Sequence, residues 1–414
     1  MKGNSRIILM PRYMANFKCT GPGCEDNCCI GWRIEVDEET YKKYRRLRRP
    51  ELAPLLEKAV TRNRSNPGPR RYAKIRLKPD GWCPFLTDER LCQLQLVLGE
   101  EYLCNTCYVY PRNFNEVNGV IEKSATLSCP EAAKLALLDP RVMEFDEVEE
   151  QLGRPQVIKS RLNTLDLKWS GRPQRYFWEL RVFAVDLLQN RAYSLEDRLI
   201  LLGMFCRKLA EYAESGRARE IPDLINTYNR LLDGGALRES LAGIPAQSTI
   251  QMKLLKELAD QRFPLVVKNT RYLECFAQCL HGLQYTQEAG VEEIGERYAA
   301  AYADYYRPFM ESHGYILEHY LVNHVFKNLF PFDFDRNTVF DSYIMLVVHY
   351  ALIKLILIGM SAFHKGLEPE LAVKLIYSFS RTVEHNTAYL NRVLDLLHAH
   401  RYDTMAWMAI MIRN

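Results

Sequence analysis

Histidine is missing from the first 280 residues of this chain, because all nine histidines of the 414-residue sequence lie at position 281 or later. Neighbouring residues in the N-terminal part therefore cannot form a zinc finger of two cysteines and two histidines. A strong charge imbalance is also missing, since the formal net charge is only +4. No sequence repeat or low-complexity tract is evident, so a repeat architecture is not expected.

No secretory leader is expected either. The first residues, Met1–Arg6, lead directly into the short apolar run Ile7–Met10 and then Pro11, and this run is too short for the apolar core of a signal peptide. We therefore expect a cytoplasmic protein. In a reducing compartment, clustered cysteines are more often metal ligands or catalytic groups than members of disulfides, so a disulfide framework is the less favoured alternative.

What the N-terminal part does contain is cysteine, because nine of the twelve cysteines lie between Cys19 and Cys129. Soft thiolates at short spacings are what Zn²⁺ and iron–sulfur clusters require, since several sulfur atoms must converge on one centre at little cost in loop-closure entropy. The missing histidines favour an all-thiolate site, either a four-cysteine zinc site or a cubane cluster. Nine cysteines exceed the needs of one site, so either two centres form or the remaining thiols are structural or redox-active.

The composition divides the chain into two predicted domains. Residues 1–150 combine the cysteines with many turn formers and no long amphipathic run, which predicts a loop-rich, cysteine-rich metal-binding module. Residues 151–414 show helical periodicity from about Pro173 onward, with Ser194 expected to cap a helix and an apolar stripe over Ile294–Met310. The expected fold class is therefore mainly α, with the N-terminal module followed by an α-helical bundle that serves as a substrate platform.

The most apolar stretch of the sequence is Tyr343–Met360, and its length invites comparison with a membrane span. It contains His349 and Lys354, with Gly359 near its end. Ionisable side chains are costly inside a bilayer, so we expect a buried core helix of a soluble bundle and no membrane partner.

The segment from Tyr41 to Lys78 is strongly basic, with fourteen Lys or Arg residues against two glutamates. Such a segment attracts nucleic acid, an acidic protein or an anionic cofactor, although a solvated helix face and a basic loop explain it equally well. Only Tyr41, Tyr44 and Tyr72 are interleaved with the basic residues. Base stacking therefore has little support, and nucleic acid is not an expected partner.

Several short motifs resemble the flagellin lysine N-methylase family. The N-terminal motifs all contain cysteine: Phe17–Cys19, Cys24–Trp32, Trp82–Leu86, Leu91–Cys92 and Cys104-x2-Cys107-x2-Tyr110-Pro111-Arg112. The paired cysteines and the segments after them also resemble the broader CxxCxxCC family of zinc- or iron-chelating proteins. Three C-terminal motifs extend the resemblance to the methylase family over the whole chain: Tyr320–Asn323, Phe330–Phe332, and Ser380–Arg381 with Glu384–Asn386.

The resemblance implies a methyltransferase that carries out lysine methylation on flagellin, the protein of the bacterial flagellum. It implies S-adenosylmethionine as the methyl donor and a cysteine-bound iron–sulfur centre, a [4Fe-4S] cluster, with Zn²⁺ as the alternative metal. The residues themselves support the metal but not, independently, the donor. The sequence has no Gly-x-Gly-x-Gly loop after a strand and no CxxxCxxC motif, so the donor site must be unconventional.

The cysteines expected to bind metal are those of the motifs above: Cys19, Cys24, Cys28, Cys29, Cys83, Cys92, Cys104 and Cys107. The segments shared with the chelating family supply a first centre, which consists of Cys28 or Cys29 with Cys83, Cys92 and Cys107. Adjacent cysteines rarely both reach one centre, so either Cys28 or Cys29 is expected to serve another role. The remaining three, Cys19, Cys24 and Cys104, are available to complete a second centre.

The other four cysteines have different expectations. Cys129 either joins one of the two centres or is structural. Cys206, Cys275 and Cys279 lie among apolar residues of predicted helices, and we expect them to be buried core thiols.

Polar methyl transfer to lysine requires an amine that is deprotonated and aligned with the methyl group. Arg381, Glu384 and His385 lie at i, i+3 and i+4, so on an α-helix they share one face, and they are the candidate catalytic residues. The alternative is a polar network or a solvated helix edge. Arg381 is alternatively an anchor for the carboxylate of the donor's methionyl group. His319 with Asn323, and Glu318 with Val322 beside them, form a second polar cluster of the same kind.

Two other classes of protein remain open. A non-enzymatic zinc or iron–sulfur regulator would use the basic segment to bind nucleic acid, and this binding would depend steeply on salt. A redox protein would show a reversible cluster potential without donor binding or methylation. The regulator lacks a recognisable recognition helix, and a simple electron carrier does not need the long helical part.

Overall fold

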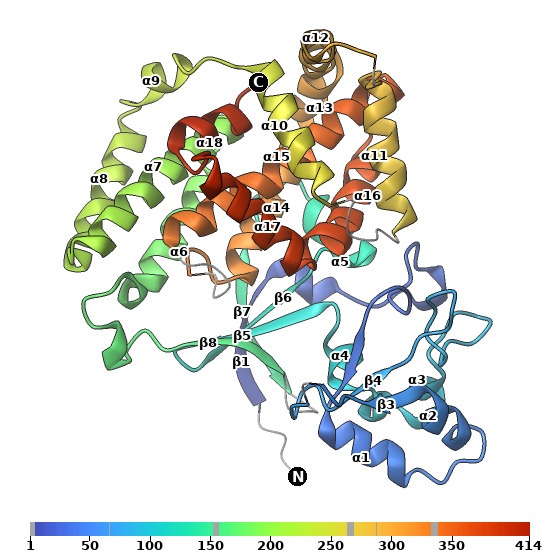
Figure 1. The fold of residues 1–414 in the computed structure, drawn as a ribbon. Coiled ribbons are helices and arrows are strands. Elements are labelled where there is room, and N and C mark those ends of the chain that lie inside the picture. The colour runs from blue at the N-terminus through green and yellow to red at the C-terminus, as the bar shows by residue number, and fades with distance from the viewer. Residues whose placement is uncertain (1–4, 66, 152–156, 263–268, 287, 333–337) are drawn as a thin grey trace. The chain divides into compact units, whose positions relative to one another are not determined.

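The computed structural model describes residues 5–414 except 66, 152–156, 263–268, 287 and 333–337. Its contacts separate the chain into two compact units, which we describe one at a time. Unit 1 consists of residues 1–116, 120–132 and 146–161, and unit 2 of residues 117–119, 133–145 and 162–414. The protein is mainly helical, with most helices in unit 2 (Figure 1), which confirms the predicted mainly α class and the helical C-terminal region.

Unit 1 contains two small β-sheets, which the loop-rich prediction for residues 1–150 does not include. The strands of the first sheet pair in the order β7-β1-β6-β5-β8 and those of the second in the order β2-β4-β3. Strands β1 and β6 are parallel, with Ile8 opposite Ile121, whereas the second sheet is antiparallel. The strand bounds are β1 (Ser5–Pro11), β2 (Ile34–Val36), β3 (Val60–Arg62), β4 (Ala73–Ile75), β5 (Arg112–Val117), β6 (Val120–Ala125), β7 (Phe145–Gln151) and β8 (Ile158–Leu162).

Short helices connect the strands of unit 1: η1 (Arg12–Asn16), η2 (Gly21–Gly23), α1 (Glu38–Arg46), α2 (Ala53–Ala59), α3 (Gln93–Leu98), η3 (Glu100–Tyr102) and α4 (Asn105–Val109). Asp37 caps α1, because its carboxylate accepts the backbone N–H of Thr40 at 2.9 Å. The same carboxylate accepts the N–H of Asn105 at 2.9 Å, which ties the start of α4 to the start of α1. The apolar core of this unit includes Cys83 and Cys104, so the cysteines lie at the edge of a packed core.

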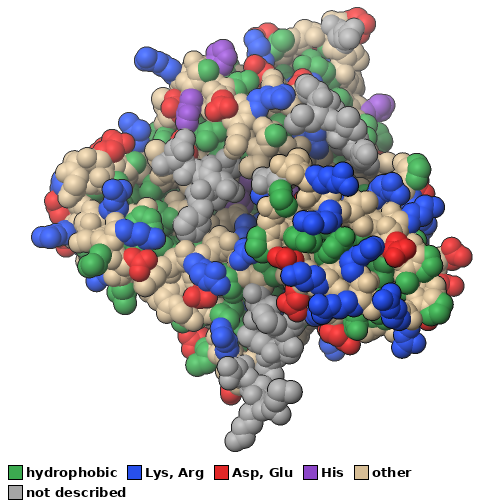
Figure 2. All heavy atoms as spheres, turned by 60° about the horizontal axis from the view of Figure 1, so that its bottom comes forward, with side chains coloured by type: hydrophobic (Ala, Val, Ile, Leu, Met, Phe, Trp, Pro, Cys, Tyr) green, Lys and Arg blue, Asp and Glu red, His purple; other side chains and the backbone are tan. Residues whose placement is uncertain are grey.

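The basic segment of residues 41–78 forms much of the surface of unit 1. All but one of its fourteen basic side chains are exposed, and Figure 2 shows a dense gathering of Lys and Arg on this part of the molecule. Lys42 and Lys43 make ion pairs with Glu38 and Glu39 one turn earlier on α1. The exposure of these side chains is compatible with both interpretations of the basic segment, a binding surface and a solvated face.

Unit 2 is an assembly of helices. Helix α5 (Pro130–Leu137) spans the point where the chain passes from unit 1 to unit 2. The others are η4 (Leu167–Trp169), η5 (Pro173–Tyr176), α6 (Phe177–Gln189), α7 (Leu195–Glu214), η6 (Ala218–Glu220), α8 (Ile221–Asp233), α9 (Arg238–Ala242), α10 (Ser248–Asp260), α11 (Thr270–Gly282), α12 (Val291–Ala301), η7 (Tyr302–Tyr306), α13 (Arg307–His313), α14 (Tyr315–Lys327), α15 (Val339–His364), α16 (Pro369–Phe379), η8 (Ser380–Glu384), α17 (Thr387–Ala399) and α18 (Met405–Ile412). The predicted cap is confirmed, since the Ser194 hydroxyl accepts the N–H of Asp197 at the start of α7.

Helix α15 is the core of unit 2, and it begins at a Thr338 cap. It is long and apolar enough to cross a bilayer, yet the whole of its most apolar window is buried inside the protein, as the sequence predicts for a core helix. Helix α11 packs against it so closely that a Cβ at Gly282 would lie 2.0 Å from the backbone oxygen of Gly359. Glycine at this crossing allows the two backbones to meet.

Two segments of unit 2 are π-helical, and neither follows from the sequence periodicity. The stripe Ile294–Met310 predicts one helix, but the structure inserts the π-helix η7 between α12 and α13. The second π-helix, η8, follows α16 and carries Arg381 and Glu384. Single π-turns within helices occur frequently at functional sites, so the side chains around both segments are candidates for a functional role.

Candidate functional site

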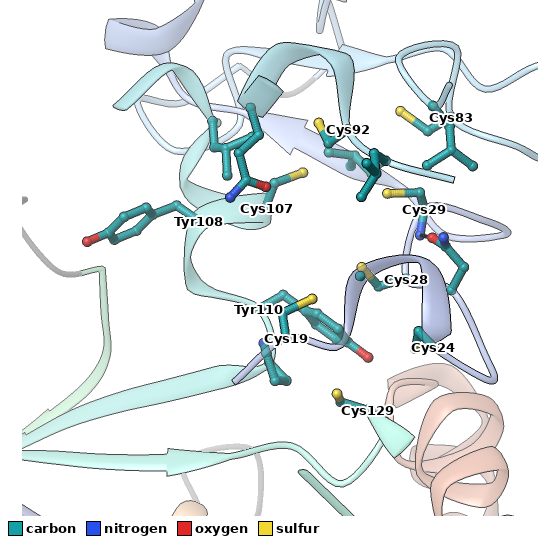
Figure 3. Close-up of a pocket in the computed structure, with 18 of the residues that line it drawn as sticks. Cys19, Cys24, Cys28, Cys29, Cys83, Cys92, Cys107, Tyr108, Tyr110 and Cys129 are labelled. Atoms are coloured by element: carbon teal, nitrogen blue, oxygen red, sulfur yellow. Dashed lines mark hydrogen bonds between the residues drawn. The ribbon is translucent and has the colours of Figure 1, made fainter. Parts of the chain in front are cut away.

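All nine N-terminal cysteines line one cavity of unit 1, with a volume of about 270 Å³. We call this the cysteine cavity (Figure 3). It brings together all eight cysteines expected as metal ligands, and it adds Cys129, which precedes α5. The wall is completed by apolar and aromatic side chains such as Trp32, Phe85 and Tyr110.

Backbone pairing brings the separate cysteine motifs together. An isolated bridge between Ile30 and Trp82 is followed by a hydrogen bond from the N–H of Cys83 to the backbone oxygen of Cys29 at 2.8 Å. A second bridge joins Leu86 to Cys92, and Cys92 is the N-cap of α3. The first bridge and its hydrogen bond join motifs that lie more than fifty residues apart in the sequence, whereas the second joins neighbouring ones.

Backbone amides point at several of the sulfur atoms. The thiol of Cys92 accepts hydrogen bonds from the amides of Leu94 and Gln95, and the thiol of Cys129 accepts them from Glu131 and Ala132. Amides of Phe85 and Thr106 do the same for Cys83 and Cys104. N–H groups directed at sulfur stabilise thiolates and are a usual feature around thiolate-bound metals.

The cysteines lie on two sides of the pocket, and the adjacent residues Cys28 and Cys29 connect the two sides, because their thiols are hydrogen-bonded to each other. Figure 3 shows Cys29, Cys83, Cys92 and Cys107 along one side of the pocket. Cys104 joins them through a hydrogen bond between its thiol and that of Cys107. The other side of the pocket holds the second group: Cys19, Cys24, Cys28 and Cys129. The arrangement therefore offers enough thiols for two four-cysteine centres.

Burial shifts the pKa values of several thiols of the cysteine cavity upward, whereas the hydrogen bond from Cys107 lowers the pKa of Cys104. Burial raises the pKa of Cys83 to about 11 and that of Cys129 to about 12, and neighbouring thiols reinforce both shifts. A metal ion supplies the positive charge that thiolates need, and it displaces these protons when it binds. Soft donors, amide hydrogen bonds and an apolar wall together fit a thiolate-bound metal centre.

The three remaining cysteines are buried in unit 2, as predicted for core thiols. Cys206, Cys275 and Cys279 are each at most 1% exposed. Burial raises the pKa of Cys275 to about 11 and that of Cys279 to about 12. None of the three lines the cysteine cavity.

Unit 2 contains a buried polar cluster around Glu384. One carboxylate oxygen accepts hydrogen bonds from the hydroxyls of Tyr320 at 2.6 Å and Ser380 at 2.9 Å, and the other lies 3.2 Å from the Lys327 ammonium. His324 and His349 complete what we call the Glu384 cluster, because their ring nitrogens and the carboxylate lie within 4.8 Å of one another. Tyr320, Ser380 and Glu384 come from motifs sixty residues apart that the sequence singles out.

Charge balance within the Glu384 cluster comes from the protein itself. Burial alone would raise the pKa of Glu384, but Lys327, together with His349 and His324, outweighs burial and holds this pKa far below the ordinary value. Two imidazoles and one carboxylate are a familiar ligand set for divalent metals. Here, however, the Lys327 ammonium already takes the position of the cation beside Glu384.

The three candidate catalytic residues have different environments. Glu384 is buried, with a side chain 8% exposed, and Arg381 is half-buried. His385 is exposed and forms the C-cap of η8. The prediction that the three residues share one face of an α-helix is therefore wrong, because a π-turn that ends at His385 takes the place of that helix. The sequence reasoning missed Lys327 and His349. The spacing of Tyr320, His324 and Lys327 at i, i+4 and i+7 was the available signal for one helix face.

The second polar cluster that the sequence suggested gains further partners in the structure. Glu318 is 1% exposed and pairs with Arg191 at 2.8 Å and Arg198 at 2.7 Å. His319 contacts the backbone oxygen of Ala136 through its Nδ1 atom at 3.1 Å, and its Nε2 atom lies 4.0 Å from the Glu318 carboxylate. The two residues therefore remain neighbours, and each has a different main partner.

Comparison with known proteins agrees with this arrangement of motifs. Residues 181–411 match the FliB lysine N-methylase C-terminal domain. The chain is 26% identical to the Lysine-N-methylases of Salmonella choleraesuis and Salmonella typhimurium over 389 residues, which is 92% of this chain and 92% of each relative. It is also 32% identical over 153 residues to the Flagellar biosynthetic protein FliU of Salmonella muenchen, covering 37% of this chain and 89% of that protein. No solved structure matches the chain.

These matches define the class of protein as a lysine methyltransferase. The chain belongs to the FliB lysine N-methylase family, because the C-terminal domain of that family covers more than half of its length. The resemblance seen in the cysteine and helical motifs is thereby confirmed.

Proposed function

We propose that this methyltransferase transfers methyl groups from S-adenosylmethionine to lysines of flagellin in the cytoplasm, and that the cysteine cavity binds a [4Fe-4S] cluster. The observation that carries the cluster is the convergence of nine thiols on one cavity of about 270 Å³. Flagellin is supported by the names of the relatives, which link lysine methylation with the flagellum. The donor is the ordinary source of methyl groups for this class of enzyme.

The first centre would be held by the group that contains Cys29. Cys83 and Cys92 supply thiols with amide donors already in place, and Cys107 lies beside them. The group of Cys19, Cys24, Cys28 and Cys129 would hold a second centre. The cysteine thiolates and the apolar wall of the cavity would set the reduction potential of a bound cluster and limit the access of water to it.

The Glu384 cluster would support methyl transfer within the family domain. Glu384 is buried, so we assign it the role of a positioning residue that fixes the charge of Lys327. His385 is the exposed member of the candidate set and would accept the proton that a substrate lysine must lose before it attacks the methyl group. Arg381 would bind an acidic group of the substrate.

The test begins with anaerobic purification and quantification of iron, sulfide and zinc, together with an absorption spectrum. We expect roughly stoichiometric iron and sulfide with a broad band near 400 nm, and loss of both in a Cys83→Ser, Cys92→Ser double variant. A matched control is the Cys206→Ser, Cys275→Ser double variant, which also removes two buried thiols but leaves the cysteine cavity intact. The loaded enzyme is then incubated with S-adenosylmethionine and flagellin, and modified lysines are located by mass spectrometry.

A zinc centre is the second candidate, because the same thiol groups satisfy the tetrahedral four-cysteine coordination of structural zinc. Zinc without iron under strict exclusion of oxygen would overturn the iron–sulfur proposal and leave a structural zinc site. Unmodified flagellin after incubation with the loaded enzyme would overturn the substrate. Single Cys28→Ser and Cys29→Ser variants separate the centres, since each should remove the metal of only one group.

A further inference from the structure

The surface of unit 1 carries a charge that neither the metal centre nor the methyl transfer uses. Residues 41–78 contain fourteen Lys or Arg residues and two Glu residues, so this segment has a formal charge of +12. The whole chain has a charge of only +4, and the rest of it therefore carries −8. We call the exposed basic side chains of residues 41–78 the basic face (Figure 2). Charge gathered to this degree creates a surface potential that attracts an anionic partner.

Contacts between its elements make the basic face one surface. Helix α1 carries four of the cations, and it is joined to the connection from β3 to β4 by Tyr41 and Tyr72, whose ring centroids lie 5.3 Å apart. The guanidinium of Arg62, at the end of β3, lies 4.1 Å from the centroid of Tyr72. The N–H of Glu38 donates to the backbone oxygen of Pro69 at 2.9 Å, which fixes the same connection against the start of α1. The basic residues around β3 therefore lie beside those of α1.

Carboxylates of the protein neutralise few of these cations. Lys42, Lys43 and Arg45 have ion-pair partners on α1 and α2. Within the part of the chain that the structure describes, the other eleven basic side chains of the segment form no ion pair. A surface that serves only solubility mixes charges of both signs. The excess of one sign therefore favours a binding surface over a merely solvated face.

The side chains of the basic face indicate the kind of anion that it binds. Nine of the fourteen are Arg, whose planar guanidinium binds a carboxylate or phosphate through two parallel hydrogen bonds. Among the described residues of the segment, no large apolar side chain is exposed that could enter a membrane. Tyr41 and Tyr72 already contact each other, and Arg62 covers Tyr72, which leaves little ring surface for the stacking of bases. Carboxylates of a protein are therefore the anions that this face fits best.

A small cavity of about 40 Å³ lies within the basic face, between α1 and α2. Arg45 and Arg48 line it together with the apolar side chains of Leu47, Leu56 and Val60. Pockets that receive a side chain of the partner, with arginine nearby, are typical of the centre of protein–protein interfaces. The cavity has room for the tip of one small apolar side chain. It therefore fits a protein segment in which carboxylates flank such a residue.

We propose that the basic face is a docking surface for a carboxylate-rich segment of the protein substrate. The identity of that substrate as flagellin rests on the proposed function, whereas the carboxylate chemistry of the face does not. A lysine that is to be methylated does not bind here, because it is itself a cation and like charges repel. Docking on unit 1 instead raises the concentration of substrate lysines available to unit 2, which belongs to the same chain.

Steady-state kinetics of the full-length, metal-loaded protein with flagellin tests this inference. The test variant reverses three exposed charges that form no ion pair in the described part of the chain: Arg46→Glu, Arg48→Glu and Arg49→Glu. We expect the KM for flagellin to rise roughly 10-fold at an unchanged kcat, because docking is weakened and the chemistry is not. The rise should be smaller at high salt, since salt screens exposed charges. The matched control reverses three exposed cations of unit 2 and should leave KM unchanged: Arg219→Glu, Arg230→Glu and Lys253→Glu.

Two further measurements separate docking from damage to the reactive site or the fold. A short lysine peptide without acidic residues should be methylated equally well by the wild type and the test variant, because it has no carboxylates to dock. A second variant, in the connection from β3 to β4, should raise the KM for flagellin in the same way: Arg64→Glu, Arg70→Glu and Arg71→Glu. Circular dichroism of each variant verifies that its fold is retained.

A KM for flagellin that both triple variants leave unchanged would overturn the inference. If these variants instead lose binding of a duplex oligonucleotide, or of vesicles that contain phosphatidylserine, the basic face serves a nucleic acid or a membrane. Flagellin that the wild type neither binds nor methylates would overturn only the substrate of the proposed function. A fluorescent glutamate-rich peptide then decides the inference: binding that the variants lose supports a carboxylate surface, and equal binding by wild type and variants contradicts it.

Discussion

The cysteine cavity of unit 1 and the buried carboxylates of unit 2 differ in where their compensating charge comes from. In unit 1, burial and neighbouring thiols raise the pKa of Cys83 to about 11, so this thiol holds its proton at neutral pH. In unit 2, burial opposes ionisation of Glu318, yet Arg191 and Arg198 outweigh it and lower its pKa. Unit 2 therefore carries its own counter-charges, whereas the proposed metal centre of unit 1 would draw its cation from outside.

This difference predicts which unit should depend on a bound ligand for its stability. A buried carboxylate that has an arginine or lysine in contact is complete without a cofactor. A set of converging thiols is complete only when a metal replaces the protons, and the free energy of metal binding is then also folding free energy. We expect unit 1 to respond to metal and unit 2 to respond to mutation of its ion pairs.

Removing the metal should produce the largest effect, and it should be confined to unit 1. Structural zinc sites in small domains contribute on the order of 10 kcal/mol of apparent binding free energy. We expect a strong chelator to abolish amide protection from hydrogen exchange around Cys83 and Cys104, while α15 retains its protection. Mass-spectrometric hydrogen–deuterium exchange with and without chelator measures both regions in one sample.

The same experiment contains its own control in the Cys83→Ser, Cys92→Ser double variant, which should be insensitive to chelator because it has already lost the site. Equal loss of protection in both units would contradict the proposed difference. It would mean that the stability of unit 2 also depends on the metal.

The second effect is the pH dependence of metal binding. Because burial raises the pKa values of Cys83 and Cys129, a thiol such as these releases a proton when it binds metal as a thiolate, and affinity rises with pH. For a four-thiolate site, Zn²⁺ affinity should rise up to about 10⁴-fold per pH unit between about pH 6 and pH 8. A competition titration of metal-free protein against a chelator of known affinity measures this slope.

Unit 2 should keep a constant stability between pH 7 and pH 8. The pKa of Glu384 is lowered in the folded state, so its contribution to stability is complete above the ordinary glutamate pKa of about 4.3 and is lost as the pH falls through the folded value. Below pH 7 unit 2 should lose some stability, because burial lowers the pKa of His319 and the unfolded chain then binds a proton near the ordinary histidine value of about 6.5 that the folded state does not. Urea denaturation of the Cys83→Ser, Cys92→Ser variant, followed by a probe in α15, provides the comparison, and a stability of unit 2 that changed between pH 7 and pH 8 would contradict it.

The third effect is the removal of a counter-charge inside unit 2. Glu384→Gln leaves the Lys327 ammonium buried without its carboxylate, and breaking a buried pair in this way costs roughly 3–5 kcal/mol. Urea denaturation measures this loss as a lower midpoint at an unchanged slope. A Glu384→Gln, Lys327→Met double variant should recover most of the stability, and Glu214→Gln at an exposed position is the neutral control. A cost below about 1 kcal/mol would show that the pair is not buried in solution.

The helical part of the fold could be predicted because its signals are local. Ser194 is followed by two acidic residues and an apolar stripe, and the structure begins α7 after it. The strands of unit 1 could not be predicted in this way, because Ile34–Val36 and Ala73–Ile75 are only three residues long and show too little alternation. The π-helix η7 has no periodic signature of its own, so Ile294–Met310 resembles one continuous helix.

The candidate sites were predictable to different extents for the same physical reason. Cysteine is rare enough that its clustering alone identifies the candidate ligands, but which group Cys28 and Cys29 join depends on the direction of each side chain in a folded loop. Lys327 and His349 are placed beside Glu384 only by the packing of α14, α15 and η8. Contacts between elements far apart in the sequence leave no local pattern.

The smallest effect should come from a buried thiol that has no part in the metal site. Cys206 is 1% exposed within unit 2, and burial raises its pKa well above the ordinary value, so it acts as a small apolar group. Cys206→Ala should cost only about 1–2 kcal/mol by loss of packing and should leave the iron, sulfide or zinc content unchanged. Urea denaturation and metal quantification of this variant beside Cys83→Ala test whether burial or position makes a thiol a ligand. A loss of metal in Cys206→Ala would contradict the division between the two units, because it would make metal binding depend on a thiol that does not line the cysteine cavity.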